Sequence, residues 1–354
     1  MINLILFIAI LGTLVLVHEL GHFLAAKKQG VRVDEFGFGL PPRIFGIKFG
    51  ETLYSLNLIP LGGFVKLFGE EYHEIKNSAL SKRAFVNKKP WQKVIIIIAG
   101  VIGNFLLGWG LLSFLFTQGI PVPTDKVIVE KVVAKSPAFT AGLKENDVIK
   151  EFLYQGEKQE LKSSTDLIAL SKKFGGKEIN LVVERDQNEI VVLLTPRANP
   201  PKDQGPLGVV ITSYVVKKYL WYQAPFYSLI ESFSITRKIA SELIKTLFLL
   251  MTFQKPSVDV AGPIGIAKYA GDAFKFGKNA LLELVALLSF NLAIVNILPF
   301  PALDGGRLVF VMYEWIARKK VNKNIEKYTN LVGILILISL GILITVNDII
   351  KLYK

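Results

Sequence analysis

Two histidines and a glutamate interrupt an apolar stretch near the amino terminus, "VLVHELGHFL" at residues 15–24. On a helix, residues four positions apart share a face, so His18 and His22 can direct two imidazoles at one ion. Zinc accepts such nitrogen ligands and, at reactive sites, takes three protein ligands and leaves a fourth position for water. Glu19 adjoins the first histidine and can accept a proton from that water. The spacing therefore predicts a metal centre that activates water.

The same spacing, His-Glu-x-x-His on a helix, is the arrangement that zinc hydrolases use. Ionisable groups inside an apolar span are costly, which favours a functional role over a pair of hydrogen-bonded interior histidines. The chain has only three histidines, so two of them occupy this one turn of sequence. The third, His73, lies in a polar, glutamate-rich stretch and is expected to be a solvated loop residue.

A third metal ligand is expected to be a carboxylate, because the chain has no cysteine and no further histidine in an apolar run. The segment "NLAIVNILPFPALDGGRL" at 291–308 holds Asp304 in a break that prolines and glycines introduce into a later apolar helix. Irregular backbone at membrane depth persists only where protein buries it or where it lines a wet cavity. A helix cap is the alternative role for Asp304.

Long apolar runs must position these side chains. Apolar residues make up 51% of the 354 residues, and a bilayer span needs about 20 of them in succession. Spans are predicted at 2–26, 94–116, 280–299 and 331–350. A fifth stretch, 225–253, carries five charged residues, which favours an amphipathic surface helix over a span. The first run lacks a basic leading region and is too long for a signal peptide.

Basic residues set the expected orientation. Lysine and arginine cluster at 27–93 and 318–327, beside the apolar runs, and the formal net charge is +13. Such clusters mark the cytoplasmic side of membrane proteins, so both termini and the insert between spans two and three are expected outside. His18 and His22 then lie near the cytoplasmic end of span one, and span three brings Asp304 to their depth. The charge is thus explained by topology rather than by nucleic-acid binding.

The polar insert at 121–200 is expected to be a separate α+β domain. Its first part, "KVIVEKVVAKSPAFTAGLKENDVIKEF", predicts two strands around a short helix. A helix follows, with Ser163 or Ser164 as its cap, and then two strands joined by a turn at 186–188. Outside the insert, the glycine-rich stretch 37–70 predicts a β-hairpin, and the small residues of 99–108 predict close packing of span two.

HELGH in the first span, together with "NILPFPALDGG" near the end of a later one, resembles the site-2 protease family of intramembrane zinc metalloproteases. The likeness covers nearly the whole chain and is closest to the bacterial RseP-like (regulator of sigma-E protease) branch. "SPAFTAGLKENDVI" is similar to the signature of a bacterial PDZ domain, present once where some relatives carry two. The resemblance implies an α-helical multi-pass membrane protein of about four spans, with a membrane-associated re-entrant β-hairpin and an inserted α+β PDZ domain.

The resemblance also implies a division of the chain. The expected parts are the first transmembrane helix with HELGH at 1–26, a cytoplasmic loop with the hairpin at 27–93, the second transmembrane helix at 94–117, an extracytoplasmic PDZ domain at 120–200, an amphipathic extracytoplasmic helix and linker at 215–275, the third transmembrane helix with its break at 279–317, and the fourth transmembrane helix at 329–350.

Carried onto this chain, the family pattern assigns roles to six residues. Zinc is bound by His18, His22 and Asp304, the general base is Glu19, and the substrate backbone is contacted by Asn291 and Asn296. Hydrogen bonding between helices is the alternative role for the two asparagines. An edge of the hairpin would pair with an unwound substrate by strand addition; a plain cytoplasmic hairpin is the alternative.

The activity implied is hydrolysis within transmembrane segments of single-span proteins, such as anti-sigma factors, in regulated intramembrane proteolysis. The enzyme would lie in the bacterial inner membrane, with its active site near the cytoplasmic side and its PDZ domain outside, binding a peptide segment. No nucleic-acid partner is expected. A membrane metal transporter would also place histidine and aspartate in spans, but it would need neither Glu19 beside a ligand nor a peptide-binding module. An inactive PDZ scaffold would not need HELGH and Asp304 intact.

Overall fold

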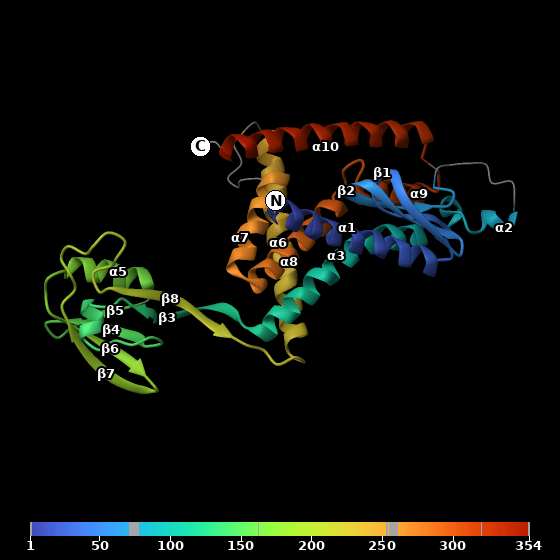
Figure 1. The fold of residues 1–354 in the computed structure, drawn as a ribbon. Coiled ribbons are helices and arrows are strands. Elements are labelled where there is room, and N and C mark those ends of the chain that lie inside the picture. The colour runs from blue at the N-terminus through green and yellow to red at the C-terminus, as the bar shows by residue number, and fades with distance from the viewer. Residues whose placement is uncertain are drawn as a thin grey trace. The chain divides into compact units, whose positions relative to one another are not determined.

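The structure is a computed structural model that describes residues 2–70, 78–161, 163–252, 254, 261–319 and 321–352. His73 and most of residues 253–260 therefore lie outside the described residues. The chain divides into two compact units, one formed by Met1–Thr117 with Leu220–Lys354 and the other by Gln118–Tyr219 (Figure 1).

Four helices of the first unit, among the residues described, are long and apolar enough to cross a membrane, with mean hydropathies between 2.1 and 2.4. They are α1 (Ile2–Lys28), α3 (Pro90–Gln118), α8 (Lys278–Ile297) and α10 (Lys323–Leu352). Long apolar runs that proline does not interrupt satisfy their backbone polar groups internally as helices. Together with the β-sheets, these helices fit a multi-pass membrane protein.

The charged stretch that was expected to be an amphipathic helix is also one continuous helix, α6 (Ala224–Met251), and it is not among the candidate spans. It packs along α3. The indole Nε1 of Trp109 donates to Pro225 O at 2.9 Å, and the hydroxyls of Ser113 and Ser228 are 2.7 Å apart. These contacts join the start of α6 to the second half of α3.

Shorter helices complete the first unit: α2 (Ser78–Ser81), the 3-10 turn η1 (Phe85–Asn87), α7 (Pro263–Phe276) and α9 (Asp304–Ala317). The gap between α8 and α9 follows from Pro299 and Pro301, which cannot continue a helix because they lack a backbone N–H. α10 is tied to the start of α7, where Asp348 Oδ2 accepts a hydrogen bond from Gly265 N at 2.8 Å. That bond satisfies an amide that the first turn of a helix leaves unpaired.

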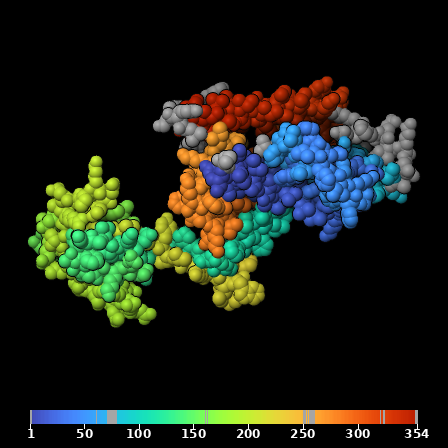
Figure 2. Space-filling model, viewed as in Figure 1, coloured from blue at the N-terminus to red at the C-terminus, as the bar shows by residue number. Residues whose placement is uncertain are grey.

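The predicted hairpin consists of β1 (Val33–Phe49) and β2 (Thr52–Leu67), and both strands bend so that they form four strand segments. Phe36 lies opposite Tyr54 on one side and opposite Val65 on the other. Tyr54 in turn lies between Phe36 and Ile47. The segments are therefore ordered 45–49, 52–56, 33–38 and 63–67, and the last forms an edge among the described residues. The sheet packs against α1 (Figure 2).

The turn of this hairpin is fixed by an ion-pair network. Glu51 Oε1 accepts hydrogen bonds from Arg83 Nη2 at 2.7 Å and from Lys27 Nζ at 2.8 Å. The Arg83 guanidinium and the Lys27 ammonium lower the pKa of Glu51 to about 2. The charged carboxylate thus holds the hairpin turn to the end of α1.

The second unit, taken by itself, is a six-stranded antiparallel sheet with two short helices. Its strand order is β7–β6–β4–β3–β8, with β5 paired to β4. The elements are β3 (Ile120–Val132), α4 (Pro137–Thr140), β4 (Val148–Tyr154), β5 (Glu157–Glu160), α5 (Ser164–Lys173), β6 (Ile179–Arg185), β7 (Asn188–Leu194) and β8 (Val209–Lys217). Its apolar core consists of alternate strand residues together with residues of the helices and loops, which are Ala138, Leu143, Leu167, Phe174 and Leu207.

This unit differs from the predicted insert at its end. It extends past residue 200 because β8 pairs with β3 and completes the sheet, so residues 215–217 belong to a strand rather than to a linker. Ser163, the first of the two serines that the sequence offered, caps α5 by accepting from Asp166 N at 3.3 Å. Arg185 donates to both carboxylate oxygens of Asp147 at 2.7 Å, and Asp147 is 1% exposed.

Candidate metal centre

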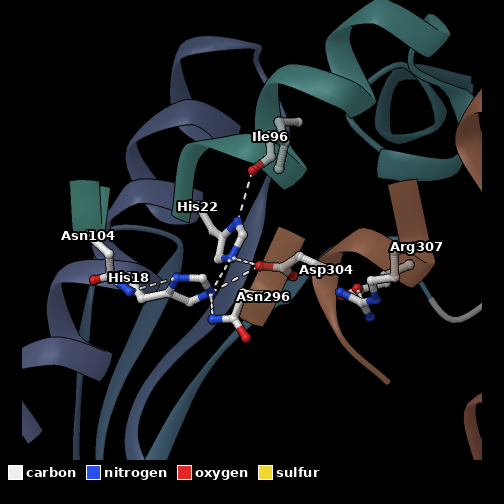
Figure 3. Close-up of polar contacts among 8 residues, drawn as sticks. His18, His22, Ile96, Asn104, Asn296, Asp304 and Arg307 are labelled. Carbon is white, nitrogen blue, oxygen red and sulfur yellow. Dashed lines mark hydrogen bonds and ion pairs between the residues drawn. The ribbon is translucent and has the colours of Figure 1, made fainter. Parts of the chain in front are cut away.

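Three side chains from distant parts of the sequence converge on one point (Figure 3). Asp304 Oδ2 lies 3.0 Å from His18 Nε2 and 3.1 Å from His22 Nε2. The two Nε2 atoms are themselves 3.1 Å apart. One turn of α1 and the first residue of α9 thus bring three candidate ligand atoms into a nearly equilateral triangle.

The triangle fits a shared zinc ion. Atoms that lie about 2.0–2.1 Å from one tetrahedral zinc are roughly 3.3 Å from each other, close to the spacing seen here. Two imidazole nitrogens with a carboxylate oxygen are a donor set that catalytic zinc sites use, with a further position left open. The side chains of His18, His22 and Asp304 are only 8%, 12% and 15% exposed, so they face the protein interior.

The interruption of the helix between α8 and α9 allows Asp304 to reach the histidines. A Cβ at Gly305 or Gly306 would collide with the backbone of residues 297–301, so the two glycines let the first turn of α9 pack directly on the break. Leu303 is the N-cap residue, and no side chain caps this helix. The Asp304 carboxylate is therefore directed at the histidines instead of serving as the cap.

A cavity of about 360 Å³ opens beside the triangle and is lined by Glu19 as well as by His18, His22 and Asp304. The edge segment 63–67 of β2 forms another part of its wall. A Cβ at Gly63 would lie 3.1 Å from Glu19 Cγ, so Glu19 lies against this edge segment. The cavity thus has in its wall a carboxylate, the triangle and a strand edge that pairs with no further strand among the described residues.

Comparison with known proteins identifies the family. A family model described as peptidase family M50 matches residues 6–340. The chain belongs to peptidase family M50. A Clostridium perfringens protein named as a candidate zinc metalloprotease is 35% identical over 345 residues, which cover 96% of each chain. The regulator of sigma-W protease RasP of Bacillus subtilis is 30% identical, over 99% of this chain and 98% of its own. The prediction of a zinc metalloprotease is confirmed.

The two asparagines that the sequence grouped together lie in different places in this M50 protease. Asn296 Nδ2 is 3.3 Å from His18 Nε2, next to the metal triangle. Asn291 instead lines a separate apolar cavity of about 190 Å³ between α1, α7 and α8. Positions five apart on a helix point in different directions, which separates the two amides.

The part that α3 plays in the M50 site was missed by the sequence analysis. His22 Nδ1 lies 2.8 Å from Ile96 O, so the ring donates its Nδ1–H there and leaves Nε2 free for a metal. One turn further along α3, a Cβ at Gly100 would lie 2.8 Å from His18 Cε1. The small residues of 99–108 predicted that this helix packs closely, but they did not indicate that it packs against the histidines.

Proposed function

We propose that this M50 protease is an intramembrane zinc protease that cleaves transmembrane segments of single-span membrane proteins, with zinc bound by His18, His22 and Asp304. The observation that carries the proposal is the convergence of the three ligand atoms within 3.1 Å of one another on a candidate membrane helix and the break after another. Ionisable groups at membrane depth are costly, so their presence on these apolar elements favours a reaction that takes place within the membrane.

Glu19 is the proposed general base. Zinc held at the triangle would polarise a peptide carbonyl and make water a nucleophile at neutral pH. Glu19 adjoins a ligand in sequence and lines the same cavity, so its carboxylate can take the proton of the attacking water and return it to the leaving amine. Asn296, beside His18 Nε2, is within reach of a substrate held at this point and is the proposed backbone contact. Asn291 remains a proposed contact for substrate that approaches along α8.

The edge segment 63–67 is the proposed docking strand for substrate. A helical peptide bond is shielded by its own hydrogen bonds, so the substrate must unwind before water can attack. An extended chain can then pair with this strand edge, which has no partner strand in the described part of the chain and lies in the wall of the metal cavity. Exposed apolar side chains on the outer half of the hairpin, among them Phe45, Ile47 and Phe49, support its association with the membrane.

For the second unit we propose a PDZ domain that faces the outside and binds a peptide segment of the substrate. Its support is architectural: an antiparallel sheet with short helices, in which "SPAFTAGLKENDVI" forms α4, the turn after it and the first two residues of β4. The basic clusters at 27–93 and 318–327 support a cytoplasmic location for the metal-site end of α1. The name of the Bacillus subtilis relative, a sigma-W regulator, supports an anti-sigma-like substrate and an RseP-like role in the bacterial inner membrane.

The test uses purified full-length protein in lipid vesicles with a model single-span substrate. Glu19→Gln should keep parental zinc content and lose cleavage, because it removes the base and not a ligand. Glu242→Gln, an exposed glutamate on α6, is the matched control and should cleave as the parent does. A Glu19→Gln protein that cleaves at the parental rate would overturn the mechanism. Zinc uptake into the vesicles without cleavage would favour a transporter instead.

A further inference from the structure

One face of α3 lies against the two histidines of α1. Ile96, Gly100 and Asn104 are spaced four residues apart and therefore share this face. Ile96 O receives the Nδ1–H of His22, Gly100 gives the rings room, and Asn104 Nδ2 lies 3.4 Å from His18 Nδ1. The face thus meets each imidazole on the nitrogen that points away from the metal triangle (Figure 3).

Asn104 is fully buried in this position, with 0% of its surface exposed. Its backbone oxygen accepts a hydrogen bond from Ser289 Oγ of α8 at 2.7 Å, a contact that does not involve the side-chain amide. Its side-chain Oδ1 has no hydrogen-bond partner among the described residues. Burying an amide whose oxygen has no hydrogen-bond partner lowers the stability of the folded protein. A function for the contact with His18 would explain why an amide occupies this position.

The position of one hydrogen on His18 supplies that reason. A neutral imidazole carries its hydrogen on one nitrogen only. If Asn104 Nδ2 donates to Nδ1, the hydrogen of His18 lies on Nε2, the atom that points at His22 Nε2 and Asp304, and Nε2 has no lone pair for a metal. The nitrogen and oxygen of an amide exchange places on a half-turn and are assigned from their hydrogen bonds. With Oδ1 turned to His18, Nδ1 donates to it and the Nε2 lone pair faces the ligand triangle.

We propose that Asn104 is a positioning residue of the metal site: its Oδ1 accepts the Nδ1–H of His18, as Ile96 O accepts that of His22. α3 then orients both imidazoles, one through a backbone carbonyl and the other through a side chain. A metal-binding histidine commonly donates its second ring nitrogen in this way, and the contact fixes the tautomer and the orientation of the ring. The inference rests on the proposed metal ligands and adds a residue that contacts neither metal nor substrate.

The test measures zinc affinity, by chelator competition, on full-length protein in detergent. Asn104→Leu keeps the side-chain volume and removes the acceptor, and it should weaken zinc binding by about 10- to 100-fold. Asn104→Ser is too short to reach His18 and should show the same loss if the leucine variant fails to fold. Asn104→Asp restores an acceptor for Nδ1–H and should bind zinc nearly as the parent does. The visible spectrum of the cobalt-substituted protein should change in the leucine and serine variants and not in the aspartate variant.

Ser289→Ala is the matched control, because it removes the hydrogen bond to the backbone of Asn104 and leaves the amide in place. It should retain parental zinc affinity. Parental zinc affinity in Asn104→Leu or Asn104→Ser would overturn the inference. A loss of zinc affinity in Asn104→Asp and Ser289→Ala as large as that in Asn104→Leu would also overturn it, since packing alone would then explain the residue. His18→Ala separates the two proposals. If it binds zinc as the parent does, the proposed ligand set is wrong; if it loses zinc while the Asn104 variants keep it, only the role of Asn104 fails.

Discussion

Replacing Gly100 by alanine tests how closely α3 must approach the two imidazoles. A Cβ at this position would lie 2.7 Å from His22 Cε1 and 2.8 Å from His18 Cε1, and would also meet His22 Nε2. Carbon atoms pack comfortably only at about 3.5 Å or beyond, so the rings or α3 must move by at least about 0.8 Å. Since a misplacement of about 1 Å at a reacting centre can cost 100-fold in rate, kcat/KM should fall by about 10- to 100-fold.

The helix itself should tolerate the change. Alanine is favoured over glycine in a helix interior by about 0.5–1 kcal/mol, so a loss of activity would not reflect a weaker α3. Gly110 lies further along the same helix, where a Cβ would meet nothing within 4 Å. Gly110→Ala is therefore the matched control and should behave as the parent does.

Cleavage of a single-span substrate and zinc content are measured together for the parent and the two variants in vesicles of one composition. Gly100→Ala should lose both activity and zinc affinity, because the displaced rings no longer direct their Nε2 atoms at one point. If Gly100→Ala cleaves substrate and holds zinc as the parent does, the reasoning is refuted. The rings would then accommodate a Cβ at this position without losing their orientation.

Three further substitutions test contacts away from the metal. The pKa of Glu51 is lowered on folding, so its ion pairs stabilise the protein above about pH 4.5 and are lost as the pH falls towards 2. Glu51→Gln should flatten the dependence of melting temperature on pH in that range, and parallel curves would contradict this. Asp348→Ala removes the acceptor for Gly265 N and should lower the free energy of unfolding by about 1–3 kcal/mol, measured by thermal melting in detergent. Arg185→Ala leaves the buried Asp147 carboxylate without its cation, although the Lys144 N–H still donates to it, and should destabilise the second unit by about 3 kcal/mol, seen as faster hydrogen exchange in β4 and β6.

Local sequence patterns determined the elements that carry the site. The four-residue spacing of His18 and His22 needs only a helix to align two imidazoles, and the apolar run around them makes that helix certain to form in a membrane. The prolines after α8 likewise specify a break, and the glycines that follow allow the close approach of Asp304. These features depend on neighbouring residues, so they can be deduced without knowing the fold.

Tertiary structure decided which surfaces those elements meet. Residues 63–67 form an edge of the hairpin sheet because both strands bend, and β8 completes the second unit by pairing with a strand distant in sequence. Asn104 reaches His18 only because α3 packs on one particular face of α1. Such contacts join residues far apart in the chain, and their free energy comes from the packing of whole helices and sheets. The sequence by itself therefore determined the ligand types and their spacing, and the packing of α3, α8 and the hairpin sheet decided what surrounds them.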